Sequence, residues 1–119
     1  MSKTVLVIDD SPFVFKTILK ALEGSEYEVV GNALNGQLGV DAYLEKRPDV
    51  ITLDVTMPVM DGLETARKLF EINPNVKIIM LSAMGDETLV TEAQGIGIQH
   101  FLTKPFKPDM LKEKLAAIL

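Results

Sequence analysis

Residues 50–62 read VITLDVTMPVMDG, and this stretch carries the pattern from which the fold can be predicted. Val50 to Leu53 form a short run of mostly β-branched residues, which is typical of a buried strand. The run ends at Asp54, and a Met-Pro turn follows. Residues 63–72 then place apolar side chains at helical spacing, and Asn73-Pro74 closes the segment. The stretch therefore predicts a strand, a loop that begins with an acid, and a helix.

The same alternation extends outward to both ends of the chain. Short apolar runs predict strands, and longer amphipathic runs predict helices between and after them. Ser11 suits the N-cap of the first helix, and Pro12 suits its first position. The predicted strands are residues 5–8, 28–31, 50–53, 76–81 and 98–102, and the predicted helices are residues 12–22, 37–45, 63–72, 87–93 and 110–118.

Alternating strands and helices indicate an α/β domain in which helices cover both faces of a parallel sheet. The nearly continuous apolar content of the first, third and fourth strands agrees with burial on both sides. Because crossovers between parallel strands are right-handed, we expect a flavodoxin-like, doubly wound five-stranded sheet. We take its strand order, 2-1-3-4-5, from such sheets as a class. Residues 1–119 are expected to form one domain.

The composition argues against several classes of protein. Apolar residues make up 47% of the 119 residues, and there is no cysteine for a disulfide framework or a thiolate zinc site. The net charge of -5, with scattered lysines and arginines, argues against a nucleic-acid surface. The first apolar run is too short for a signal peptide, and no run approaches the ~20 residues of a membrane span. We therefore expect a cytoplasmic protein whose partners include neither nucleic acid nor a membrane.

Polar side chains lie at the ends of four of the predicted strands. Asp9 and Asp10 follow the first strand, Asp54 the third and Ser82 the fourth, and Lys104 comes after the fifth. Ligands of open parallel sheets bind outside the carboxyl ends of the strands, so these side chains should meet in one crevice. Each residue alone could serve in a turn or a helix cap, and the prediction therefore rests on the whole set.

The three predicted carboxylates would repel one another, so one of them holds a proton or a cation neutralises them. The available ligands are hard oxygens, which favours Mg²⁺. Lys104 can pair with Asp54 or with a phosphoryl oxygen, and Ser82 offers a hydroxyl donor. A nucleophilic carboxylate, a metal, a cation and a hydroxyl are together the groups needed for phosphoryl transfer onto an aspartate.

Four segments of the chain resemble the response-regulator receiver family, and together they span nearly its whole length. They are Val-Ile-Asp-Asp at residues 7–10, Leu-Asp-Val-Thr-Met-Pro-Val-Met-Asp-Gly at 53–62, Leu-Ser-Ala at 81–83 and Phe-Leu-Thr-Lys-Pro-Phe at 101–106. Each piece alone is weak, but the combination is specific. The segments Thr-Met-Pro at residues 56–58 and Ser-Ala-Met-Gly at residues 82–85 are most similar to those of the single-domain chemotaxis regulators of this family.

The resemblance implies roles for the acids and for their metal. Asp54 would be the phosphoacceptor of a two-component signalling switch, with a sensor histidine kinase as the phosphoryl donor. Mg²⁺, the implied cofactor, would be bound directly by Asp10, Asp54 and the backbone carbonyl of Thr56, and through water by Asp9. Such a receiver is not an enzyme in the usual sense, because it catalyses only its own phosphorylation and slow dephosphorylation.

The resemblance also implies how the switch would work. Lys104 would contact the phosphoryl group, and its bond to Pro105 would be cis. Ser82 would move towards the phosphoryl group and Phe101 would turn inwards, which would reshape the surface of the fourth helix, fifth strand and fifth helix. That surface would bind an output protein, and a component of the flagellar motor switch is the partner that the resemblance favours.

The resemblance also implies that two positions, which vary within the family, bear on the lifetime of the phosphorylated form. Thr56 lies two residues after Asp54, and Met84 lies two residues after Ser82. Neither side chain can orient an attacking water as an amide or a carboxylate could. We therefore hypothesise a long-lived phosphorylated form that an auxiliary phosphatase clears.

Other functions compete with this interpretation. The chain could be a phosphorelay intermediate, or a receiver excised from a longer regulator, for example a transcriptional one. A haloacid-dehalogenase-like phosphohydrolase also uses an aspartate after a parallel strand, but it needs a second Asp where Thr56 stands. A flavodoxin-like electron carrier shares the fold, but Asp9 and Asp10 would repel the phosphate that its first loop must hold.

Overall fold

The computed structural model describes residues 3–119, in which strands and helices alternate throughout. The strands are β1 (Lys3–Ile8), β2 (Tyr27–Ala33), β3 (Val50–Asp54), β4 (Ile78–Ser82) and β5 (His100–Thr103). The helices are α1 (Pro12–Leu22), α2 (Gly36–Lys46), α3 (Gly62–Ile72), α4 (Glu87–Ile96) and α5 (Pro108–Ile118). Within these described residues, no helix is both long enough and apolar enough to cross a membrane.

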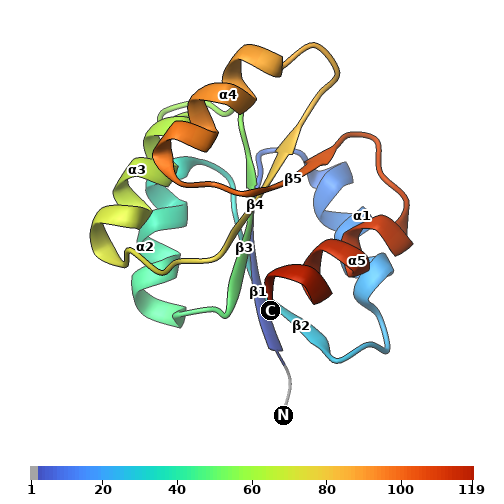
Figure 1. The fold of residues 1–119 in the computed structure, drawn as a ribbon. Helices are drawn as coiled ribbons and strands as arrows, with labels where there is room; N and C mark the ends of the chain where they lie inside the picture. Colours follow the sequence, from blue (N-terminus) through green and yellow to red (C-terminus); the bar gives the residue numbers. More distant parts are fainter. Residues whose placement is uncertain (1–2) are drawn as a thin grey trace.

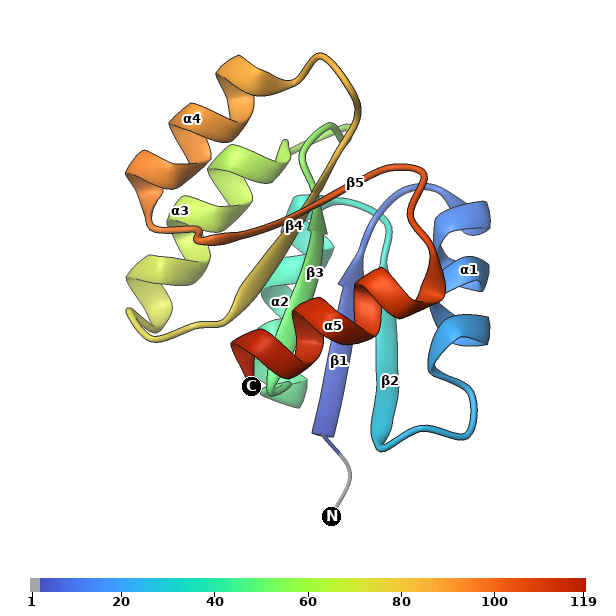
Figure 2. The ribbon, with the colours of Figure 1, turned by 45° about the vertical axis from the view of Figure 1, so that its right-hand side comes forward.

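The strands form one parallel sheet in the order β2-β1-β3-β4-β5, which confirms the predicted fold. Helices α1 and α5 cover one face of the sheet, and α2, α3 and α4 cover the other (Figures 1 and 2). After β1 the chain moves towards one edge of the sheet, and after β3 it moves towards the other. Because the strands are parallel, their carboxyl ends share one side, opposite the side at which β1 begins in Figure 1. We call this side the carboxyl end and the opposite side the amino end.

An apolar layer packs against each face of the sheet. Leu6 and Ile8 of β1 enter the layer beneath α2, α3 and α4, whereas Val5 and Val7 enter the layer beneath α1 and α5. All four side chains are fully buried. Burial on both faces explains why the central strands read as continuous apolar runs instead of alternating ones.

Side-chain caps fix where three of the helices begin. Each capping residue accepts the backbone N–H of the residue three positions further on, inside the helix that it precedes. The pairs are Ser11 with Val14 at 3.3 Å, Asn35 with Leu38 at 2.9 Å and Asp61 with Glu64 at 2.9 Å. The predicted start of α1, with Ser11 as the cap and Pro12 as the first helical residue, is therefore confirmed.

Two predicted strands were too long at their amino ends. The N–H of Val76 donates to the carbonyl of Asn73 in a turn, so Val76 lies outside β4. The N–H of Ile98 donates to the carbonyl of Ala93 where α4 ends, so Ile98 lies outside β5. Both side chains are buried all the same. Hydrophobic character correctly predicted their burial, but it does not distinguish a residue of the strand from a buried residue just before it.

Candidate functional site

Three carboxylates lie together at the carboxyl end of the sheet, as the sequence predicted. Asp54 is the last residue of β3, and Asp9 and Asp10 follow directly after β1, the neighbouring strand. One ligand oxygen from each of the three residues lies within 4.8 Å of the others. Asp9 is fully buried and Asp54 is 7% exposed, whereas Asp10 is exposed. The cluster is therefore anionic, and two of its three members are withdrawn from water.

Asp9 is held by its backbone and by both oxygens of its side chain. Its N–H donates to the carbonyl of Ala33 on β2 at 2.9 Å. Its Oδ1 accepts the N–H of Ser11 at 2.9 Å, and its Oδ2 accepts a hydrogen bond from Lys104 Nζ at 3.1 Å. These contacts fix the orientation of a carboxylate that has no access to solvent.

The backbone around Asp54 is fixed by close packing with α3. The N–H of Val55 donates to the carbonyl of Leu81 on β4 at 3.2 Å, and the N–H of Gly62 donates to the carbonyl of Val55 at 2.9 Å. A Cβ atom on Gly62 would clash with the carbonyl oxygen of Asp54. Only glycine therefore lets the start of α3 approach the acid this closely.

Lys104 approaches the cluster from the loop after β5. Its Nζ lies 3.1 Å from Asp9 Oδ2 and 3.1 Å from Asp54 Oδ1. Its backbone N–H donates to the carbonyl of Ser82 at 2.7 Å, and its peptide bond to Pro105 is cis, as predicted. One ammonium thus pairs with two of the three carboxylates, and the cluster keeps a surplus of negative charge when all are ionised.

The crowding of charges shifts the pKa of two groups. Burial, followed by the charge of Asp9, raises the pKa of Asp54, and Lys104 together with the N–H of Thr56 offsets this only in part. Burial by itself lowers the pKa of Lys104, but the charges of Asp9 and Asp54 outweigh it and the pKa of Lys104 is raised. Asp54 is therefore costly to ionise even beside a charged lysine, and a further cation would stabilise its carboxylate.

The donor set fits a hard divalent cation. The clustered ligand atoms are carboxylate oxygens, and the group that residues 3–119 bring together contains neither His nor Cys. Mg²⁺ prefers one or two carboxylates combined with water or phosphate oxygens, whereas zinc prefers nitrogen and sulfur. The exposure of Asp10 leaves one side of the cluster open to a hydrated ion. The residues present therefore fit Mg²⁺.

The structure places the other predicted site residues at two locations. Ser82, 4% exposed, ends β4, and Thr56 is exposed in the loop after β3, where its N–H bonds to Asp54. Both lie at the carboxyl end beside the acids. Phe101 lies on β5, is partly buried, and packs against the apolar layer beneath α2, α3 and α4. The fold therefore brings Ser82 and Thr56 to the site, whereas Phe101 lies partly exposed at the edge of the core.

Two residues beside the site were not predicted from the sequence. Gly62 had no assigned role in the sequence analysis. A glycine directly after a capping Asp61, at the first position of a helix, could have indicated that the helix packs closely there. Asp86 Oδ2 accepts the N–H of Ala83, the residue after Ser82, at 2.8 Å. An acid that precedes a helix is expected to cap that helix, so no pattern in the sequence indicated a bond between Asp86 and Ala83.

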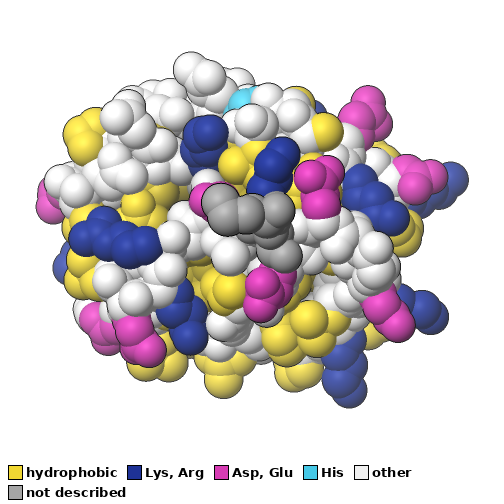
Figure 3. All heavy atoms as spheres, turned by 90° about the horizontal axis from the view of Figure 1, so that it is seen from below, with side chains coloured by type: hydrophobic (Ala, Val, Ile, Leu, Met, Phe, Trp, Pro, Cys, Tyr) yellow, Lys and Arg dark blue, Asp and Glu magenta, His cyan; other side chains and the backbone are white. Residues whose placement is uncertain are grey.

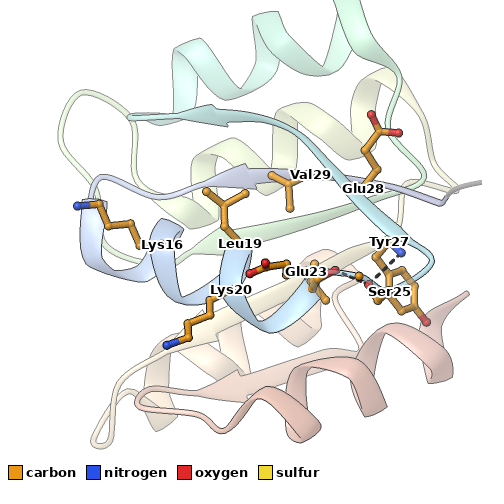
Figure 4. A pocket seen from close by; sticks show the side chains of 10 residues that line it. Lys16, Leu19, Lys20, Glu23, Ser25, Tyr27, Glu28 and Val29 are labelled. Carbon is orange, nitrogen blue, oxygen red and sulfur yellow. Dashed lines mark hydrogen bonds between the residues drawn. The ribbon is translucent and has the colours of Figure 1, made fainter.

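One sizeable hollow of the described chain lies away from the acidic cluster. It measures about 740 Å³ and lies between α1 and β2, where Leu19, Tyr27 and Val29 line it (Figure 4). None of the predicted site residues borders it. A hollow of about 400 Å³ is lined by Ser82 and Asp86, beside the acidic cluster. Chemistry identifies the site better than size does, because the acids combine burial, crowded charge and a shifted pKa.

Comparisons with known proteins cover nearly the whole sequence. Residues 5–116 match the family model described as the response regulator receiver domain. The chain is 41% identical over 115 residues to the chemotaxis protein CheY of Thermotoga maritima, covering 97% of this chain and 96% of that protein. It is 43% identical over 125 residues to a protein-glutamate methylesterase/protein-glutamine glutaminase of Halalkalibacterium halodurans, covering 95% of this chain and 36% of that protein.

A solved structure shares the arrangement of strands and helices. The chain matches one chain of the CheX-CheY-BeF3-Mg²⁺ complex from Borrelia burgdorferi with a TM-score of 0.91 and 30% sequence identity. The match covers 98% of this chain and 88% of that chain. Sequence and structure comparisons thus agree over the same residues.

Proposed function

The chain belongs to the response regulator receiver family, and from this premise we propose that it is a phosphorylation-activated switch of a two-component system. Residues 1–119 act as one receiver domain in the cytoplasm, and Asp54 accepts a phosphoryl group from a sensor histidine kinase. One observation carries the proposal. Asp54 is buried at the carboxyl end of β3, among two further acids, with an ammonium 3.1 Å from its Oδ1.

The proposed step transfers a phosphoryl group between two side chains. An ionised oxygen of Asp54 attacks the phosphorus of a phosphohistidine, and a P–O bond forms as the N–P bond of the donor breaks. The histidine ring keeps the electron pair of that bond and takes up a proton. Lys104, which already pairs with Asp54, would pair with the added phosphoryl oxygens, and the Ser82 hydroxyl would supply a further donor.

The proposed Mg²⁺ ligands are Asp10, Asp54 and the backbone carbonyl of Thr56, with Asp9 acting through water. Both carboxylate oxygens of Asp9 already accept hydrogen bonds from the protein, which supports an indirect role for this residue. The exposure of Asp10 supports direct binding. When bound, the ion would neutralise part of the carboxylate charge and polarise the phosphoryl oxygens.

The proposed signal passes from Ser82 through Phe101 to the surface of α4, β5 and α5. Ser82 pairs in register with Thr103, and Met80 pairs with Phe101, so the two switch residues lie on neighbouring strands. Phe101 is partly buried and has no hydroxyl that needs a partner when the ring turns inwards. A population shift between two packings of this ring would change the surface that an output protein binds.

We propose chemotaxis as the output, with a flagellar motor switch protein as the target and an auxiliary phosphatase as a second partner. The full-length similarity to the Thermotoga chemotaxis protein supports the output, and the CheX-CheY complex supports a second protein partner. The methylesterase match supports the alternative of a receiver within a longer regulator. If the chain binds a motor switch protein only when it is phosphorylated, chemotaxis is favoured over a role within a longer regulator.

Intact-mass measurement after incubation with acetyl phosphate tests the proposed chemistry. The wild type should gain one phosphoryl group when Mg²⁺ is present and none without it, and Asp54→Asn should gain none. Asp49→Asn carries the same substitution at the amino end of the sheet and should react like the wild type. The proposal is wrong if the folded wild type stays unmodified with both acetyl phosphate and a phosphorylated histidine kinase.

A further inference from the structure

Asp86 closes the loop between β4 and α4 onto itself. Its Oδ2 accepts the N–H of Ala83 at 2.8 Å, and its own N–H donates to the carbonyl of Ala83 at 3.3 Å. Asp86 is partly buried and lies directly before α4. Ala83 directly follows Ser82, the last residue of β4. The closed loop therefore begins at the proposed site and ends at the first turn of α4.

The carboxylate of Asp86 is used differently from the side chains that cap α1, α2 and α3. Ser11, Asn35 and Asp61 each accept an N–H inside the helix that follows them. Asp86 also precedes a helix, and its backbone carbonyl accepts the N–H of Val90 at 2.9 Å, but its side chain does not cap α4. Instead, the side chain is directed back to the end of β4. Capping its own helix is the ordinary role of an aspartate at this position, so the backward contact calls for another explanation.

Gly85 gives the loop the turn that this contact needs. Its φ is +94°, a conformation that residues with a side chain rarely adopt. A Cβ atom on Gly85 would meet no neighbouring atom within 4 Å, so lack of space does not explain the glycine. The backbone conformation does, because the turn brings Asp86 back to Ala83. The loop thus contains both the residue that turns the chain and the residue that closes it.

The closed loop is connected to the phosphoryl-accepting site through Ser82. The carbonyl of Ser82 accepts the backbone N–H of Lys104 at 2.7 Å, and the ammonium of Lys104 pairs with Asp9 and Asp54. The start of the loop is therefore bonded to the residue that supplies the cation of the site. A phosphoryl group and a carboxylate are both anions that accept hydrogen bonds from backbone N–H groups. An anion that arrives beside Ser82 therefore competes with the carboxylate of Asp86 for the N–H of Ala83, and the negative charge of Asp86 repels it.

We propose that Asp86 is a positioning residue that holds the β4–α4 loop closed in the unphosphorylated protein. Its bond to Ala83 opposes the movement of Ser82, and the arrival of an anion at Asp54 displaces it. Release then frees Ser82 and the first turn of α4 together, because Asp86 is hydrogen-bonded to Ala83, the residue directly after Ser82, and to Val90 in the first turn of α4. The inference rests on the proposed function and names a residue that sets the balance between the two states of the switch.

Beryllofluoride with Mg²⁺, followed by ¹⁵N nuclear magnetic resonance, provides the test. Asp86→Ala removes the acceptor, Asp86→Asn keeps a neutral acceptor oxygen, and Glu87→Ala removes a neighbouring acid that does not bond to Ala83. Asp86→Ala should bind beryllofluoride about threefold to tenfold more tightly than the wild type and Glu87→Ala, with Asp86→Asn closer to the wild type. The amide proton of Ala83 should shift upfield in Asp86→Ala before any ligand is added, but not in Glu87→Ala.

Gly85→Ala tests the same loop without changing its charge. A Cβ makes the required φ unfavourable, so this variant should open the loop and bind beryllofluoride more tightly. Equal affinities for Asp86→Ala and Glu87→Ala would overturn the role of Asp86, as would an Ala83 resonance that does not move. A wild type that binds no beryllofluoride and gains no phosphoryl group would overturn the proposed function itself, which separates the two failures.

Discussion

The two ends of the sheet each carry a lysine paired with carboxylates, but they treat these charges differently. At the amino end, Lys3 lies 3.7 Å from Glu26, and the two side chains are 43% and 61% exposed. At the carboxyl end, Lys104 lies 3.1 Å from both Asp9 and Asp54, whose side chains are 0% and 10% exposed. Lys3 and Glu26 are solvated and their charges cancel. Asp9 and Asp54 are buried, and the single charge of Lys104 cannot cancel both of theirs.

The rest of the amino end confirms the contrast. Asp49 accepts hydrogen bonds from the N–H of Thr4 at 2.7 Å and from its hydroxyl at 3.1 Å. Viewed from below, lysines and arginines are interspersed with acids and form no large area of one sign (Figure 3). Charges at this end can be accounted for by local structure. Unbalanced burial at the carboxyl end is costly for folding and is therefore the stronger indication of a ligand.

The largest expected effect comes from removing the lysine at each end. Lys104→Ala should lower the free energy of unfolding by about 2–4 kcal/mol at pH 7, because it leaves two buried carboxylates without their cation. Lys3→Ala should change it by less than about 0.5 kcal/mol, because its ion pair is solvated. Urea unfolding of both variants without Mg²⁺ measures the difference. Similar losses for the two variants would contradict the contrast between the ends.

Exposed residues at the carboxyl end should affect chemistry without affecting stability. Thr56→Asn combined with Met84→Glu introduces an amide and an acid that can orient water, and should speed loss of the phosphoryl group by about tenfold. The free energy of unfolding should stay within about 0.5 kcal/mol of the wild type, because both side chains are exposed. Lys77→Gln, an exposed change before β4, should alter neither quantity. Intact-mass measurements over time give the rate at which each phosphorylated form loses its phosphoryl group. An unchanged rate in the double variant would contradict the lifetime hypothesis.

The smallest expected effect concerns the pH dependence of Asp54. Because its pKa is raised in the folded protein, the folded state binds a proton more tightly than the unfolded chain, and ionisation of Asp54 opposes folding. This loss develops as pH rises from the ordinary carboxyl range through the raised pKa. Without Mg²⁺, Asp54→Asn should therefore be more stable than the wild type by about 1 kcal/mol at pH 7, with the difference falling towards zero in acid.

Mg²⁺ should narrow that difference. The wild type should gain ~1.4 kcal/mol when Mg²⁺ is at ten times its Kd, and Asp54→Asn should gain less because it has lost a ligand. Thermal unfolding at several pH values, with Mg²⁺ or with a chelator, measures both the pH-dependent difference in stability and the stabilisation by Mg²⁺. If the free energy of unfolding changes equally with pH in the wild type and in Asp54→Asn, ionisation of Asp54 does not oppose folding. That result would contradict the raised pKa of Asp54.

Much of the fold followed from local patterns in the sequence. The helix at residues 12–22 was predicted to its exact bounds, because Ser11 and Pro12 mark its start and its apolar spacing marks its length. Val76 and Ile98 were wrongly placed in strands, because a buried turn residue and a buried strand residue have the same hydrophobic character. The strand order agreed with the class of fold from which it was taken.

The sequence by itself determined the alternation of strands and helices, and it placed Asp9, Asp10 and Asp54 at the carboxyl ends of strands that become neighbours. Periodicity and capping are local properties, so the sequence contains them directly. Only the tertiary structure decided that one lysine reaches two carboxylates, that α3 approaches Asp54 closely enough to require glycine at 62, and that Asp86 bonds backwards. Those facts depend on how side chains from separate elements meet, and no local pattern specifies such distances.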